Sequence, residues 1–298
     1  MEYLLHLLIM ICIYSILAQS LSLVAGYSGQ ISLAHAGFYG IGAYTTALLT
    51  VSFGMPPLLN LLLAMLLSGI LAFVVAKVAV KTIDDYYVII TLGIQVVIYS
   101  VMNNWQSVTN GPLGIAGIPP FSIFGIALES KWGFLLLSAI LAAIVWFILH
   151  NIMTSAFGRM LRALSEDEVY TVCLGKNVGQ AKVVSFVISG MLASIAGVLY
   201  AYYISYIDPT SFTLDESIFI LSIVIIGGMR NLKGVFLAAV FLVLLPEALR
   251  FVGMPSSVAA NMRQIIYGIA LIIVVSRKKK ELGFVLKDKG NIEDKRVR

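Results

Sequence analysis

Residues 3–76 read YLLHLLIMICIYSILAQSLSLVAGYSGQISLAHAGFYGIGAYTTALLTVSFGMPPLLNLLLAMLLSGILAFVVA, and none of these 74 residues is Asp, Glu, Lys or Arg. At about 20 residues per membrane-spanning helix, the stretch can cross a bilayer about three times. The chain of 298 residues is 60% hydrophobic and 12% charged, whereas soluble proteins have about 25% charged residues. A soluble enzyme, a nucleic-acid-binding protein and a disordered chain are therefore excluded, and a polytopic membrane protein is predicted.

Nine apolar stretches, separated by polar, charged or Gly/Pro-rich breaks, predict an all-α membrane protein with about nine transmembrane helices. The first is expected to be a retained span, because no basic region precedes it as in a cleaved signal. The last three have charge-free cores of only 13 residues, so they are open to being tilted, broken or re-entrant helices. The predicted spans are 3–25, 31–52, 57–80, 86–104, 132–152, 182–204, 213–229, 234–250 and 259–276.

Basic residues give the predicted orientation, since short cytoplasmic loops of membrane proteins collect Lys and Arg. With nine spans, 17 of the 20 basic residues fall on one side of the membrane. The N-terminus is therefore expected outside and the C-terminus in the cytoplasm. Residues 1–277 then form a single transmembrane domain with a cytoplasmic loop at 153–181, and residues 278–298 form a basic cytoplasmic tail. The tail is either a stop signal that faces anionic lipid or a site for a partner.

The stretch GYSGQISLAHAGFYGIGAY, residues 26–44, is more polar and richer in glycine than contact with lipid requires. Its glycines allow helix backbones to approach closely, and Gln30, Ser32 and His35 need hydrogen-bond partners or a wet cavity inside the bilayer. Two interpretations stay open for these polar groups. They line a path for a solute, or they pack and cap the broken end of a helix.

The fourth predicted span, 86–104, carries a second polar stripe. Thr91 and Gln95 are four residues apart and share one helix face. They either line a path for a small zwitterionic or uncharged solute or hydrogen-bond to neighbouring helices. The connection that follows, 105–131, is rich in turn residues and is expected to form an ordered external loop.

A short cytoplasmic helix is expected between the fifth and sixth predicted spans. Ser165 and Glu168 have the spacing of a capping box, an apolar run follows at 169–174, and Gly175 is placed to end the helix. This helix is too short and too charged at its start to span a membrane. Its apolar face must therefore dock, either on this chain's own membrane domain or, as we favour, on a partner protein.

Catalytic and metal-binding motifs are missing from the sequence. The three histidines are far apart, no HExxH or GxxxxGK[ST] occurs, and the two cysteines offer neither a disulfide framework nor a metal cluster. The centres of the predicted spans contain no Asp, Glu, Lys or Arg, which disfavours proton-coupled pumping. The prediction is a permease without catalytic site, metal or cofactor of its own. A self-sufficient secondary transporter or channel is the rival, and an integral-membrane enzyme is disfavoured.

Four blocks of the sequence carry a resemblance to known proteins. They are GYSGQISLAHAGFYGIGAYTTALL, the Thr91-Leu92-Gly93 stretch leading to NNWQSVTNGPLGIAGIPP, GRMLRALSEDEVYTVCLGKNV, and IIGGMRNLKGVFLAAVFLVLLPEALR. In this order, from about Leu21 to Arg250, they resemble the LivM-type permeases of high-affinity branched-chain amino acid ABC transporters. The resemblance implies that this chain forms half of a path for branched-chain amino acids in the inner (plasma) membrane. Related permeases carry urea, short amides, ribose or nucleosides, which stay open as substrates.

The resemblance also implies the partners and a division of labour. The partners are a LivH-type second permease, two cytoplasmic ATPase subunits that bind the ATP, and an extracytoplasmic solute-binding protein; no nucleic acid is expected. The loop 158–178 is implied to seat on an ATPase, although Thr171, Val172 and Cys173 stand where small alanines are common in such loops. Coupling through Arg230–Lys233 is the alternative. The coupling candidates are Glu166, Glu168, Val169, Val172 and Gly175, and the path candidates are Gln30, Ser32, His35, Thr91 and Gln95.

Overall fold

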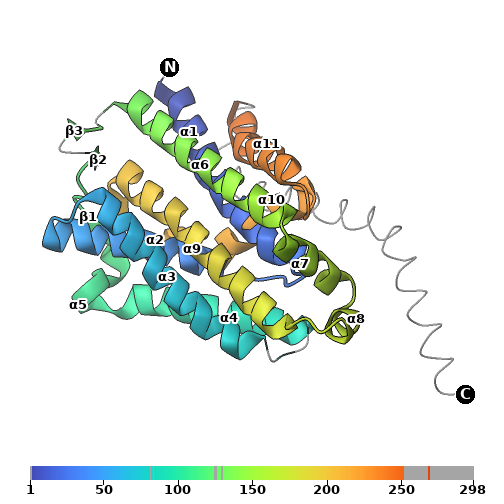
Figure 1. Cartoon of the computed structure of the whole chain (residues 1–298). Coiled ribbons are helices and arrows are strands. Elements are labelled where there is room, and N and C mark those ends of the chain that lie inside the picture. The colour runs from blue at the N-terminus through green and yellow to red at the C-terminus, as the bar shows by residue number, and fades with distance from the viewer. Residues whose placement is uncertain are drawn as a thin grey trace, which may run out of the picture. The chain divides into compact units, whose positions relative to one another are not determined.

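The computed structural model describes residues 2–80, 82, 84–123, 126–128, 130–251 and 268, and most of them are helical (Figure 1). The chain divides into two units, Met1–Val243 and Leu244–Arg298, and the contacts below lie in the first. The predicted tail, 278–298, lies outside the described residues. The long helices are α1 (Glu2–Ser22), α2 (His35–Phe53), α3 (Pro57–Ala79), α4 (Asp84–Asn104), α6 (Lys131–Thr154), α9 (Val178–Ile204), α10 (Leu214–Gly227) and α11 (Leu232–Phe251).

Eight of the nine predicted spans coincide with these eight long helices, and the ninth, 259–276, lies outside the described residues except for Gly268. Among the described residues, five helical stretches are long and apolar enough to cross a membrane: Glu2–Tyr27, α3, Tyr86–Asn104, α6 and α9. The chain is therefore a multi-pass, mostly helical membrane protein. Nine crossings and the side of each terminus stay predictions.

The outer helices carry large apolar side chains on the surface and small residues inside. On α3, Leu62, Leu66 and Ile70 repeat every four residues on one face and are exposed, whereas Ser68 and Ala72 on the opposite face are fully buried. In water such a face would be unstable, but lipid tails are as apolar as leucine. This distribution indicates that α3 faces lipid with its large residues and protein with its small ones.

Helix α9 lies at the centre of the bundle, where it packs against α1, α2 and α3 (Figure 1). Its contact with α2 is close because both helices have a glycine at the crossing. A Cβ on Gly42 would collide with the backbone of Ser194, and one on Gly197 would collide with the carbonyl oxygen of Tyr39. The predicted role of Gly42 in close helix packing is therefore confirmed.

The connection after α4 is ordered in its described residues. It contains α5 (Gln106–Thr109), the 3-10 helix η2 (Gly111–Leu113) and three short strands. Strand β1 (Ile115–Ala116) pairs antiparallel with β4 (Tyr206–Ile207), which follows α9, and β2 (Ser122–Ile123) pairs antiparallel with β3 (Ile126–Ala127). These strands were not predicted, because two residues are too few to show a period in sequence.

Candidate functional site

The helical path between α1 and α2 is broken inside the protein. α1 continues as a π-helix, η1 (Leu23–Tyr27), and residues 28–34 are not helical. The predicted span 31–52 therefore begins four residues later than expected, at His35. Gly26 is needed in the π-helix because a Cβ there would collide with the carbonyl oxygen of Met229. π-helical turns of this kind occur often at functional sites.

Two side chains of α4 hydrogen-bond to the backbone around this break. Thr91 Oγ1 accepts a hydrogen bond from Leu33 N–H at 3.1 Å. Gln95 Oε1 accepts one from Gly37 N–H at 2.6 Å, and its Nε2 donates to the carbonyl oxygen of Phe212 at 2.8 Å. The first N–H groups of any helix lack partners within the helix. Thr91 and Gln95 therefore fix the start of α2 against α4.

Helices α1 and α10 hold the same end of α2. Ser217 Oγ on α10 accepts a hydrogen bond from Ala36 N–H at 3.0 Å. His35 Nε2 lies 2.8 Å from Ser20 Oγ, which itself donates to the carbonyl oxygen of Leu17, so Nε2 is the donor of this pair. The role of Ser217 at the start of α2 was not predicted, since a serine in an apolar helix often bonds only to its own helix backbone.

Gln30 and Ser32 lie within the break and bond locally. Gln30 Oε1 accepts from Ser28 Oγ at 3.3 Å, and Ser32 Oγ accepts from Ala34 N–H at 3.3 Å. All five predicted path residues are at most 7% exposed. The structure thus places them within or beside one broken segment, although within the described residues no hydrogen bond joins one of the five side chains to another. Their role in a path stays a prediction.

The loop after α6 forms two short helices, α7 (Ala156–Glu166) and α8 (Glu168–Cys173). The predicted capping box of Ser165 and Glu168 is wrong. Ser165 lies in the last turn of α7, and the cap of α8 is Asp167, whose carboxylate accepts a hydrogen bond from Tyr170 N–H at 2.9 Å. Asp is as good an N-cap as Ser. Glu168 instead pairs with Lys182 at 2.7 Å.

Gly175 ends α8 as predicted, with a left-handed backbone (φ 71°) that glycine adopts without strain. Its N–H donates to the carbonyl oxygen of Val172 at 2.9 Å, and the N–H of Lys176 donates to that of Thr171 at 3.4 Å. These two bonds form a Schellman motif, which satisfies carbonyls at the helix end.

The apolar face of α8 is exposed. Val169 is 74% exposed and Val172 54% exposed, and the neighbouring Tyr170 and Leu174 are also exposed. Thr171 is the only buried residue of the helix. Exposed apolar clusters of this kind are typical of surfaces that contact a protein or a membrane.

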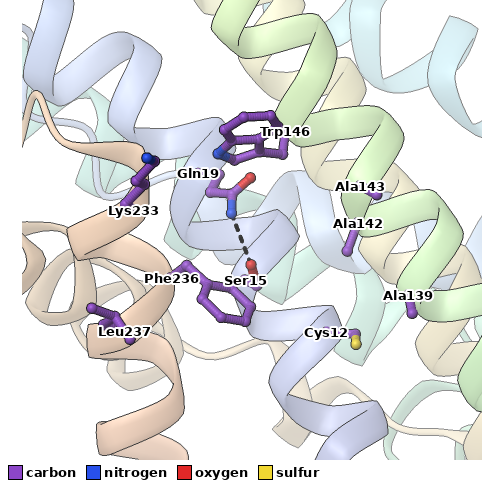
Figure 2. Close-up of a pocket in the computed structure, with 10 residues that line it drawn as sticks. All are labelled: Cys12, Ser15, Gln19, Ala139, Ala142, Ala143, Trp146, Lys233, Phe236 and Leu237. Carbon is purple, nitrogen blue, oxygen red and sulfur yellow. Dashed lines mark hydrogen bonds between the residues drawn. The ribbon is translucent and has the colours of Figure 1, made fainter.

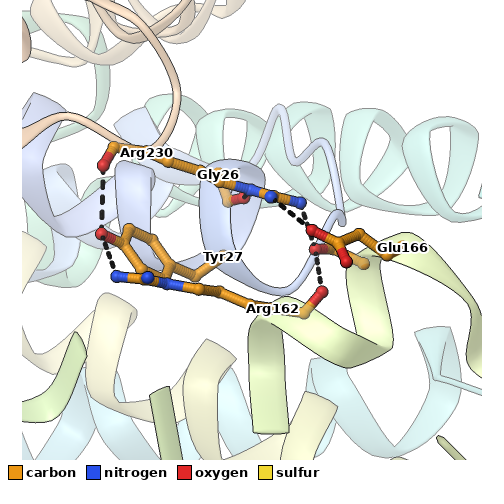
Figure 3. Close-up of polar contacts among 6 residues, drawn as sticks. Gly26, Tyr27, Arg162, Glu166 and Arg230 are labelled. Carbon is orange, nitrogen blue, oxygen red and sulfur yellow. Dashed lines mark hydrogen bonds and ion pairs between the residues drawn. The ribbon is translucent and has the colours of Figure 1, made fainter. Parts of the chain in front are cut away.

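Arg230, in the turn between α10 and α11, joins the end of α7 to the π-helix η1, which precedes the break (Figure 3). Its Nε donates to the carbonyl oxygen of Gly26 at 3.1 Å. Its two terminal nitrogens donate to Glu166 Oε1 at 2.9 Å and to Ser165 Oγ at 2.7 Å. One guanidinium thus holds the π-helix and the last turn of α7 together. Arg has the planar set of donors that such a three-way contact needs.

Tyr27 adds a second link between the same segments. Its hydroxyl donates to the carbonyl oxygen of Arg230 at 3.0 Å, and the guanidinium of Arg162 lies over its ring at 5.0 Å (Figure 3). No sequence pattern singles out Tyr27 or Arg162, because a tyrosine at a helix end and an arginine in a short loop between spans are common. We call Tyr27, Arg162, Ser165, Glu166 and Arg230 the clamp.

Comparison with known proteins identifies relatives of this chain. The high-affinity branched-chain amino acid transport system permease protein LivM of Salmonella typhimurium is 35% identical over 264 residues, which are 81% of this chain and 62% of that protein. LivM of Escherichia coli K12 is 34% identical over 261 residues, 80% of this chain and 61% of that protein. A probable LivH permease of Methanocaldococcus jannaschii is 24% identical over 275 residues, 88% of this chain and 84% of that protein.

The chain spans less than two thirds of the length of these two bacterial LivM proteins. No solved structure matches it. Residues 3–275 match the family described as the permease component of branched-chain amino acid transport systems. This match covers all described spans, the break and the clamp, and the chain therefore belongs to that family of permease components.

Proposed function

We propose that this chain is a transmembrane subunit of an ABC importer in the plasma membrane and forms half of the path for branched-chain amino acids. A LivH-type permease forms the other half, an extracytoplasmic binding protein delivers the solute, and two cytoplasmic ATPase subunits bind and hydrolyse ATP. Family membership and the names of the LivM relatives support this proposal. No cofactor is assigned to the chain itself.

The exposed apolar face of α8 is the observation that carries the proposal. Val169 and Val172 project from a helix whose only buried residue is Thr171, and the helix lies beyond the ends of α6 and α9. Burial of a valine side chain in a protein contact contributes about 1.5–3 kcal/mol relative to leaving it exposed. An ATPase groove is the surface that such a helix would fill.

The clamp connects the docking helix α8, through α7, to the segment that lines the proposed path. When the ATPase pair closes on ATP, α8 moves, and Arg230 and Tyr27 carry that movement from α7 to the π-helix at Gly26. The polar residues of the break then reorganise and open the path to the other side. ATP drives this change because it binds one arrangement of the ATPases better than the other.

Reconstitution tests the proposal. Proteoliposomes that contain both permeases and the ATPases, with ATP on the ATPase side and leucine-loaded binding protein on the other, should accumulate leucine. Vesicles with a hydrolysis-deficient ATPase are the control. Leucine transport by the two permeases without any ATPase would support a secondary transporter instead, and transport of urea or ribose but not leucine would reassign the substrate.

A further inference from the structure

A cavity of about 540 Å³ lies between α1, α6 and α11 (Figure 2). Small residues on α6 leave the space open, and the surface that they share with α1 and α11 is almost entirely apolar. We call this cavity the slot. Its apolar lining consists of Cys12, Ala139, Ala142, Ala143, Phe236 and Leu237.

One end of the slot is polar. Figure 2 shows Gln19, Trp146 and Lys233 together at that end, with Cys12 at the other. Gln19 is 2% exposed, its Nε2 donates to Ser15 Oγ at 2.9 Å, and its Oε1 has no hydrogen-bond partner among the described residues. A buried amide oxygen without a donor is costly, so a ligand that supplies a hydroxyl or a water would be stabilised here.

A second cavity, of about 310 Å³, continues from this polar end, since Trp146 and Lys233 line both. Its walls include Arg162 and Arg230 of the clamp and His150, which stacks on Trp146 with ring centroids 5.1 Å apart. We call it the basic pocket. The two cavities together place an apolar space directly beside a cationic one.

The basic pocket has an excess of positive charge. Glu166 pairs with Arg230, but in the part of the chain that the structure describes neither Arg162 nor Lys233 has a carboxylate partner. The N-terminal turn of α11 adds the positive end of a helix dipole next to Lys233. An anionic group is the complement that this pocket lacks.

We propose that the slot and the basic pocket are one binding site for an anionic glycerophospholipid such as phosphatidylglycerol. Its phosphate lies between Arg162 and Lys233, a headgroup hydroxyl donates a hydrogen bond to Gln19 Oε1, and an acyl chain fills the slot towards Cys12. The membrane surrounding these helices supplies such a molecule, and basic pockets between helices at the cytoplasmic face are known to hold lipid headgroups. Neither free phosphate nor an apolar protein helix matches both cavities.

Fluorescence quenching of Trp146 tests this site. The full-length chain, with Trp105 and Trp132 replaced by phenylalanine, is placed in nanodiscs of phosphatidylcholine. Phosphatidylglycerol with brominated acyl chains is then titrated in, and brominated phosphatidylcholine is the reference lipid. We expect the anionic lipid to quench Trp146 at a lower mole fraction than the neutral one. Equal quenching by both lipids would overturn the proposal.

Matched variants test the binding of the headgroup and of the acyl chain separately. Lys233→Gln should weaken the preference for phosphatidylglycerol about fivefold, whereas Lys77→Gln, at the end of α3 and outside both cavities, should leave it unchanged. Ala142→Phe should fill the slot and abolish preferential quenching, and Ile140→Phe, on the exposed face of α6, should not. An unchanged preference in Lys233→Gln contradicts the proposal.

Two further outcomes are informative. If Ala142→Phe leaves the preference intact, the pocket binds a phosphate group without the chain and the lipid site is wrong. A photoreactive residue at position 237 in the complete complex should cross-link to lipid. Cross-linking to the second permease instead would show that protein covers the slot and would overturn the proposal. None of these readouts depends on transport activity, so the proposed function can fail independently.

Discussion

Arg230 and Glu166 form an ion pair at 2.9 Å although 64 residues separate them in sequence. The pair connects the turn before α11 to the last residue of α7, and the same guanidinium reaches Gly26 in the π-helix. Three segments that are far apart in the chain therefore meet at one side chain. Changes at this side chain should affect communication between them more than folding.

Replacing Arg230 by glutamine is expected to uncouple the proposed transporter without unfolding it. Both partners of the ion pair are partly exposed, so the loss of the pair itself should lower the free energy of unfolding by no more than about 1 kcal/mol. Substrate-stimulated ATP hydrolysis by the reconstituted complex should fall about tenfold if the lost bonds contribute about 1.4 kcal/mol to the active arrangement. Glu166→Gln, which leaves the bond to Gly26, is the milder control. Full activity in Arg230→Gln would exclude the clamp as the route.

A charge on the exposed face of α8 should prevent docking. Val172→Asp would bury an unpaired carboxylate in the contact, so stimulated ATP hydrolysis should be lost while both permeases still assemble. Leu113→Asp, at a more exposed apolar side chain on the connection after α4, is the control and should retain activity. Asp167→Ala should cost about 1 kcal/mol of α8 stability and reduce activity only partly. Normal hydrolysis in Val172→Asp would rule out α8 as the contact.

Two Gly→Ala substitutions should have opposite effects on stability. Gly42→Ala drives a methyl group into the backbone of Ser194 and should destabilise the α2–α9 contact by about 1–3 kcal/mol or more. Gly93→Ala meets no atom within 4 Å in the middle of α4 and should stabilise that helix by about 0.5–1 kcal/mol. Unfolding temperatures in detergent measure both. Equal temperatures for the two variants would contradict the close packing.

Variants of Gln95 and Gln30 distinguish a structural role of these residues from a role in lining the proposed path. Gln95→Leu removes the bonds to Gly37 and Phe212 and should lower both stability, by about 1–3 kcal/mol, and leucine uptake. Gln30→Leu removes only a local contact with Ser28, so the complex should assemble and melt normally while uptake falls. Uptake at the wild-type level in Gln30→Leu would leave only the packing interpretation for that residue.

The orientation can be tested at α8. In a background without Cys12 and Cys173, a cysteine at position 169, where Val169 is 74% exposed, should react with a membrane-impermeant thiol reagent only after the cells are opened. A cysteine at position 113 should react from outside intact cells. Labelling of position 169 from outside would reverse the predicted topology.

The sequence predicted the helices well because lipid imposes a simple rule on it. A span such as α3 must be apolar over its whole length, and its ends are marked by Pro57 and by Lys77. The break after α1 was harder, since residues 31–34 read as the start of a span until their neighbours are known. Thr91 on α4 supplies a partner for the unwound backbone, and no pattern in one sequence reveals such a pairing.

The prediction of helix α8 shows the same limit. Its place, its exposed valines and its end at Gly175 were predicted from local spacing, because caps and stops act within a few residues. The cap was assigned two residues too early, to Ser165 instead of Asp167, since both residue types are good caps. Ser165 Oγ instead accepts a hydrogen bond from Arg230. A contact between residues so far apart in the chain cannot be read from local spacing.

The two ends of α8 have a thermodynamic consequence for its recognition. Six residues cannot hold a helix in water on their own, because nucleation is unfavourable and few bonds follow it. The Asp167 cap and the two bonds around Gly175 fix this short helix before any partner arrives. A protein that docks on it would therefore meet a preorganised ligand and would not have to supply the entropy of ordering a loop. Most of the energy of that contact would be left for affinity and for movement.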